Sequence, residues 1–247
     1  MGSPRRDPPV PDGSSLYYQH GDGLSGLAWT IAGLFVLRRL LRRHFSDAIT
    51  AATLVTILLG TNLYHYATYD SSFSHAYSFF LFAAFLELVE QWHARPRHVT
   101  SVLLGVVAGL IVLTRHTNVL LLVFFPLYGV LNRESFRARL GVIRREARRV
   151  ALIAAVAAIV VAPQLAISYQ ATGKPIVSSY GNLGFYWGSP GIVAVLFSVQ
   201  KGLFFWTPVL LLAPGSHTRR GPWCGHWRAA NSVAGTAYRL RYLSRLS

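Results

Sequence analysis

The stretch that decides the fold is VALIAAVAAIVVAPQLAI, residues 150–167, which carries no ionisable side chain. A helix of about 20 apolar residues is long enough to cross the hydrocarbon core of a bilayer. The preceding connector, residues 132–149, holds seven arginines. Arginine beside an apolar span is typical of the cytoplasmic side of a membrane protein. The stretch therefore predicts a membrane helix that starts from an arginine-rich inner connector.

The composition of the chain agrees with this prediction. Of 247 residues, 52% are hydrophobic and 13% are charged, whereas ordinary soluble domains carry about 25% charged residues. Mean hydropathy is +0.37. Low charge with six Trp, twelve Tyr and fourteen Phe excludes a disordered or collagen-like chain, and a single Cys excludes a disulfide scaffold. The net charge of +15 does not predict a nucleic-acid partner, because the basic residues flank apolar segments.

The apolar segments predict an all-α fold, a polytopic transmembrane helix bundle of about seven spans with an irregular outer-face loop. Such a chain is expected in the cell (plasma) membrane as a multi-pass protein, with membrane lipid around it. The seven segments are residues 23–41, 48–66, 75–92, 99–113, 117–131, 150–167 and 202–213.

The arginine-rich connectors set the expected topology. Residues 38–47, 92–98 and 132–149 should all be cytoplasmic. These connectors lie on the same side of the membrane only if residues 99–131 cross it twice, with a tight reversal at residues 115–118. The alternative is one long tilted helix with Arg115 facing protein.

The sequence divides into three parts. Residues 1–22 form an outer N-terminal segment, residues 23–213 the transmembrane bundle, and residues 214–247 a basic C-terminal part. The last part is interpreted as a cytoplasmic tail or as a frame-shifted end. An outer N-terminus without the apolar core of a signal peptide predicts a further upstream segment.

The connector of residues 64–75 holds the strongest candidate for chemistry. It packs Asp70 between His65 and His75 among three tyrosines. A carboxylate at a low-dielectric boundary is suited to general base catalysis, so Asp70 is the first catalytic candidate and Asp22 the second. The alternative is an aromatic belt around a water-exposed Asp. The two histidines could also bind a divalent metal together with Asp70, but nothing in their spacing demands it, so the cofactor stays unknown.

Three cations are predicted at the outer face, where a phosphate would pair with them. They are Arg115 at the reversal, Lys174 in the long outer segment and Lys201 before the last span. Tyr180 and Trp187 offer flat faces for stacking on a ring or packing on a lipid chain. The alternatives are helix-end cations that reach toward water and aromatic side chains that only anchor the loop.

Several stretches resemble the polytopic glycosyltransferases of the GT-C fold, including the dolichyl-phosphate-mannose–protein mannosyltransferase-like and aminoarabinose-transferase-like membrane proteins. The resemblance covers about residues 16–213. The stretches that carry it are GTNLY at 60–64, SHAYSFF at 74–80, LTRHTN at 113–118 and QKGLFFWTP at 200–208. The family's reversal has an Arg-Pro-Thr-Asn-like pattern, and here His116 stands where Pro is usual.

The resemblance implies a polyprenyl-phosphate-linked sugar as donor. An acidic residue would deprotonate the acceptor hydroxyl, and basic residues would stabilise the leaving phosphate. Arg115 and Lys201 match by motif, and His75 joins the substrate-binding candidates. The family's essential Asp follows its first helix, a position with no match in this chain, so Asp70 would be a substitute base.

Two other functions remain open at this stage. One is a small membrane transporter or channel, which would show inverted repeats and helices broken at the membrane centre. The other is an inactive fragment or a non-catalytic membrane assembly partner.

Overall fold

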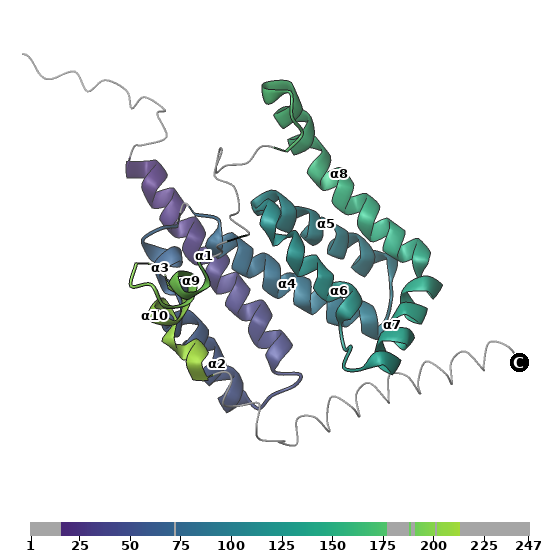
Figure 1. The fold of residues 1–247 in the computed structure, drawn as a ribbon, viewed down its shortest axis with the longest axis horizontal. Helices are drawn as coiled ribbons and strands as arrows, with labels where there is room; N and C mark the ends of the chain where they lie inside the picture. The colour runs from purple at the N-terminus through teal and green to yellow at the C-terminus, as the bar shows by residue number, and fades with distance from the viewer. Residues whose placement is uncertain (1–15, 72, 177–187, 189–190, 201, 213–247) are drawn as a thin grey trace, which may run out of the picture. The chain divides into compact units, whose positions relative to one another are not determined.

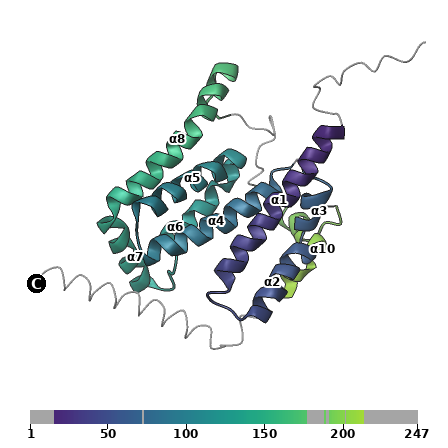
Figure 2. The same cartoon turned by 180° about the vertical axis from the view of Figure 1, so that it is seen from behind.

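The computed structural model describes residues 16–71, 73–176, 188, 191–200 and 202–212. All regular elements within these residues are helical, as predicted. The chain forms two compact units, which we call unit 1 (Met1–Ala84) and unit 2 (Phe85–Ser247), and the boundary between them falls inside one helix. Figures 1 and 2 show the helices from the front and from behind.

Unit 1 contains three helices and the first half of a fourth. They are α1 (Leu16–Leu41), α2 (Asp47–Gly60), α3 (Leu63–Thr68) and α4 (His75–Ala94). The last turn of α1 holds Arg38 and Arg39, where cations favour the helix dipole. The connector to α2 is closed by an ion pair between Arg42 Nε and Asp47 Oδ1 at 2.7 Å.

Helix α1 is the organising element of unit 1. It contacts α2 and α3, and it packs against the start of α4. The ring of Trp29 meets Phe80 edge-on at 4.8 Å between centroids. The hydroxyls of Ser25 and Tyr77 lie 3.1 Å apart. These contacts place the middle of α1 beside the first two turns of α4.

The predicted single span over residues 48–66 is wrong, because the helix breaks after Gly60. Thr61 takes an extended conformation, and its hydroxyl donates to the Ile57 carbonyl at 2.6 Å. That hydroxyl also accepts from the backbone N–H of Leu63 at 3.2 Å, at the start of α3. A glycine followed by side chains that hydrogen bond the local backbone ends a helix even within an apolar run.

Unit 2 begins with the second half of α4. It continues with α5 (His98–Thr114), the 3₁₀ helix η1 (His116–Val123), α6 (Phe124–Leu127), α7 (Arg133–Arg145), α8 (Ala147–Thr172), α9 (Ile192–Phe197), α10 (Leu203–Trp206) and the 3₁₀ helix η2 (Pro208–Leu212).

The predicted reversal after α5 is confirmed, and the alternative of one long helix is wrong. Arg115 is extended, with φ −156° and ψ 126°, which ends α5. The chain then returns along α5, since Trp92 contacts both Ser101 near the start of α5 and Phe125 at the end of the return. The return is mostly 3₁₀ rather than α-helical. The larger 3₁₀ rise lets residues 116–127 cover about 22 Å.

Helices α5 and α8 form the tightest seam of unit 2, and they lie side by side in Figures 1 and 2. A Cβ on Gly105 would lie 2.7 Å from the Ile153 carbonyl, and one on Gly109 would lie 2.7 Å from Val160 Cβ. Contacts advance together along both helices, so the two run parallel. Only glycine allows so close an approach of two helices.

Within the described residues, two helices are long and apolar enough to cross a membrane, namely residues His20–Leu41 of α1 and all of α8. Helix α8 has no buried residue. Shorter apolar helices cover Asp47–Gly60, His98–Thr114 and His116–Leu127. The predicted span over residues 202–213 is wrong, because α10 ends at Trp206 and η2 follows. Pro208 has no N–H to continue the helix.

Candidate functional site

The candidate base Asp70 lies directly after α3 and is hydrogen bonded to His65. The Nε2–H of His65 donates to Asp70 Oδ2 at 2.9 Å. Because a carboxylate only accepts, a neutral His65 then has its free lone pair on Nδ1. The two side chains are 56% and 43% exposed, for His65 and Asp70 respectively, so a substrate can reach them. The Asp70–His65 pair thus offers a carboxylate and an oriented imidazole.

The backbone at the end of α3 fixes this pair. The N–H groups of Tyr69 and Asp70 both donate to the His65 carbonyl, at 2.9 and 3.2 Å. These bonds close the last turn of α3 and bring Asp70 back toward the ring five residues earlier. Histidine and aspartate five apart meet because the helix ends between them.

Aromatic rings connect the pair to His75 at the start of α4. Tyr69 stacks on His65 at 5.7 Å between centroids, and Tyr66 meets the other side of that ring edge-on at 5.8 Å. Tyr66 also stacks on His75 at 3.9 Å. The structure therefore brings together Asp70, His65 and His75, as the sequence predicted, in one aromatic cluster.

The second carboxylate candidate, Asp22, is exposed on α1. One turn further along, a Cβ on Gly26 would lie 2.7 Å from Ser71 Cβ. Helix α1 thus passes against the residue that follows Asp70. Asp22 and Asp70 therefore lie on neighbouring elements of unit 1.

Two of the three predicted phosphate-binding cations, Arg115 and Lys174, lie among the described residues of unit 2. Arg115 is half-buried after the end of α5, and Lys174 is exposed after the end of α8. Since α5 and α8 run parallel, both cations lie toward the same end of unit 2, as the predicted topology requires. Helix α8 ends at Thr172 and is followed by its cap residue Gly173, whose φ of +70° suits glycine. Lys201, Tyr180 and Trp187 lie outside the described residues.

A second cluster, which sequence analysis missed, surrounds His93 near the end of α4. The Nε2–H of His93 donates to the Phe125 carbonyl at 2.9 Å. An Nη1–H of Arg139 donates to His93 Nδ1 at 2.7 Å. Since arginine has no acceptor, Nδ1 must be unprotonated and the imidazole neutral. The ring stacks on Tyr128 at 5.2 Å with an interplanar angle of 8°, and Arg139 also lies over that tyrosine, 5.7 Å from its centroid.

The surroundings of His93 change its acid–base behaviour. Burial, together with the Arg139 cation, lowers the pKa of His93 from 6.5 to about 4. Burial also lowers the pKa of Arg139. The cluster joins α4, α6 and α7, and both ring nitrogens of His93 are engaged in hydrogen bonds inside it, which makes it a structural contact. Residues 93 and 139 are too far apart in sequence for a local pattern to connect them.

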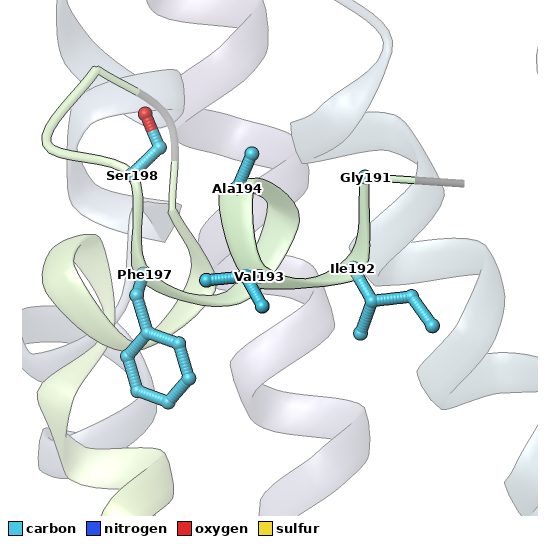
Figure 3. A pocket seen from close by; sticks show the side chains of 6 residues that line it. All are labelled: Gly191, Ile192, Val193, Ala194, Phe197 and Ser198. Carbon is cyan, nitrogen blue, oxygen red and sulfur yellow. The ribbon is translucent and has the colours of Figure 1, made fainter. Parts of the chain in front are cut away.

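A hollow beside α9 carries no chemistry of its own. It has a volume of about 680 Å³ and is lined by Gly191, Ile192, Val193, Ala194, Phe197 and Ser198. Figure 3 shows Ile192, Val193 and Phe197 pointing to one side of α9. It is an apolar surface without a titratable group.

Among the residues that the structure describes, no three His, Cys, Asp or Glu side chains are placed to hold a metal ion. The Asp70–His65 pair with its aromatic neighbours is therefore the candidate functional site. No protein-family model, curated protein or solved structure matches the chain.

Proposed function

We propose that this chain is a multi-pass membrane glycosyltransferase that moves a sugar from a polyprenyl-phosphate donor to an acceptor hydroxyl at the outer face. The observation that supports it is the Asp70–His65 hydrogen bond of 2.9 Å in an exposed, aromatic-lined site. An oriented carboxylate and imidazole form a general base, and flat rings suit the apolar face of a sugar.

The proposed reaction needs no nucleotide, because the phosphate-linked sugar is already activated. The acceptor hydroxyl gives its proton to the Asp70–His65 pair as its oxygen bonds to the anomeric carbon. The bond from that carbon to the phosphate oxygen breaks, and its electron pair leaves with the polyprenyl phosphate. Cations are needed to bind the phosphate and stabilise its charge, and Arg115, Lys174 and Lys201 are the candidates that the sequence offers for this role.

A lipid-linked donor requires a membrane-embedded enzyme. The apolar, unburied surface of α8 supports that placement, because a large exposed apolar face on a long helix needs a non-aqueous surrounding. Helix α1 adds a second such surface, with Leu24 and Phe35 exposed. Seven spans and the plasma membrane are part of the proposal.

The test is donor turnover by the full chain reconstituted in liposomes. Polyprenyl-phosphate sugars labelled in the sugar, from a panel of hexoses and pentoses, are supplied with a membrane extract as the source of acceptors. Release of polyprenyl phosphate and transfer of label are followed by chromatography. D70N keeps an oxygen that accepts from His65 but removes the basic carboxylate, and should lower turnover about 10²–10⁴-fold, as the loss of a general base does.

The matched control is D47N, which changes another exposed aspartate of unit 1, the one paired with Arg42. It should retain turnover within about twofold, because surface ion pairs contribute little. Equal turnover by D70N and the unmodified chain would contradict the role of Asp70. No turnover of any donor by the unmodified chain would contradict the function itself.

A further inference from the structure

Helix α7 presents two different kinds of arginine. Arg139 is half-buried and used inside unit 2, where it donates to His93. In contrast, Arg133, Arg137 and Arg144 are exposed. With 100° per residue, these three fall within an arc of about 40° on the helix. The contact through Arg139 therefore fixes the rotation of α7 and leaves a stripe of arginines facing outward.

An apolar stripe runs beside the arginines. It consists of Phe136, Leu140 and Ile143, spaced four and three residues apart, so they share one side of the helix. Phe136 is 47% exposed, and the other two are half-buried. The only acidic residue of α7 is Glu134. A basic stripe beside an apolar stripe is the pattern of a helix that lies in a membrane interface.

The chain connectivity sets the depth of α7 relative to α8. Only Glu146 separates the two helices, and α8 is the most apolar candidate span, with no buried residue. The first turn of α8 contains Arg148 and Arg149, so charged residues continue up to its apolar part. If α8 crosses the bilayer, α7 is held at the level of the lipid headgroups.

The start of α7 is built as a firm helix end. Asn132 Oδ1 accepts from the Ser135 N–H at 2.8 Å, and the Ser135 hydroxyl accepts in return from the Asn132 N–H at 2.9 Å. This capping box stabilises the helix from its first turn. The arginine stripe is thus held on a preformed helix.

We propose that α7 lies on the inner membrane surface and binds anionic phospholipid headgroups through Arg133, Arg137 and Arg144. Guanidinium groups pair with phosphate by two parallel hydrogen bonds. The inner leaflet carries the anionic lipids that attract basic segments next to a span. The apolar stripe enters the boundary between headgroups and acyl chains. This inference depends on α8 crossing the bilayer and not on sugar transfer.

The experiment measures lipid binding by the full chain in neutral detergent micelles. Fluorescent phosphatidylglycerol is the anionic probe, and phosphatidylcholine with the same label is the zwitterionic one. The unmodified chain should bind phosphatidylglycerol more tightly, with an affinity that falls as salt is raised. Each arginine lost should weaken this binding about fivefold, and R133Q/R137Q/R144Q about 100-fold, with phosphatidylcholine binding unchanged.

Two control variants separate charge from other effects. R133K/R137K/R144K keeps all three charges and should retain most of the affinity. A138Q adds a glutamine at an exposed position of the same helix without removing a charge, and should bind as the unmodified chain does. The single variant R137Q, with helix content checked by far-UV circular dichroism, gives the fivefold step with the smallest change to the fold.

Three results would overturn the proposal. One is phosphatidylglycerol binding by the triple glutamine variant that equals that of the unmodified chain. Another is equal affinity of the unmodified chain for the two lipids. The third is a labelled RNA oligonucleotide that competes for the same arginines with higher affinity than the lipid, since it would assign the stripe to nucleic acid.

Discussion

Acidification should destabilise unit 2 through His93, because its imidazole is folded in the neutral form. Its Nδ1 accepts from Arg139 and its Nε2–H donates to the Phe125 carbonyl. A proton added to Nδ1 would face the positively charged guanidinium group of Arg139 and would break the hydrogen bond between Arg139 and His93. The perturbation is therefore a pH titration of the unmodified chain beside H93Q, whose carboxamide offers a donor and an acceptor but takes up no proton.

The magnitude follows from the two pKa values of His93. In the unfolded chain histidine has a pKa of about 6.5, and in the folded chain burial and Arg139 lower the pKa of His93 to about 4. Between these values the unfolded chain binds a proton that the folded chain excludes. The free energy of unfolding therefore falls as pH drops below about 6.5, and the loss is complete below about 4. It amounts to about 2 kcal/mol at pH 5 and about 3 kcal/mol in full.

The assay is thermal unfolding of both proteins in the same detergent from pH 8 to pH 4. A loss of about 2 kcal/mol corresponds to a Tm lower by roughly 4–8 °C in a chain of this size. Other titrating groups shift both proteins alike, so the difference between the two pH curves isolates His93. Parallel curves for the unmodified chain and H93Q would refute the argument that His93 is folded in its neutral form.

Two other substitutions test the packing of unit 2, and both are measured by denaturant or thermal unfolding. G109A should lower the free energy of unfolding by about 1–3 kcal/mol, because its Cβ would overlap Val160. The control is G141A, at a helical glycine with open space around it. It should leave the free energy of unfolding unchanged or raise it by up to about 1 kcal/mol. If G109A proved as stable as the unmodified chain, α5 and α8 would be able to move apart with no loss in the free energy of unfolding. W92F should cost about 1–2 kcal/mol, because Trp92 Nε1–H donates to Ser101 Oγ at 3.0 Å in a buried position; no loss would mean that water replaces the indole N–H.

The long helices could be predicted from sequence because their signal is additive. Residues 23–41 and 150–167 are mostly apolar and have arginines at one end. Helices α1 and α8 cover both segments and extend beyond them by up to seven residues. The reversal at Arg115 was also predictable, since topology required it. Over a long apolar segment the hydropathy of many residues adds up, so one atypical position does not change the predicted helix.

The breaks inside apolar segments could not be predicted in the same way. Gly60-Thr61-Asn62 is a short polar interruption, which a hydropathy average passes over. Its effect depends on the Thr61 hydroxyl, which bonds both the helix behind it and the helix ahead. Pro208 in the predicted last span was a visible signal of a break that the apolar average obscured.

The two clusters differ in how visible they are in the sequence. Asp70 and His65 are five residues apart, so a local pattern found them. His93 and Arg139 lie 46 residues apart, and only the fold brings them together. Helix α7 was predicted as a connector because arginines dominate it, although the spacing of Phe136, Leu140 and Ile143 was a readable sign of an amphipathic helix.

The glycine seam between α5 and α8 has a consequence for biosynthesis. Gly105 meets Ile153 and Val156, about fifty residues later in the chain. At about 5–20 residues per second of translation, the two halves of the seam emerge several seconds apart. During that time the groove that Gly105 and Gly109 form on the newly synthesised α5 is not covered by α8. Whatever covers this groove in the meantime has to leave when α8 arrives.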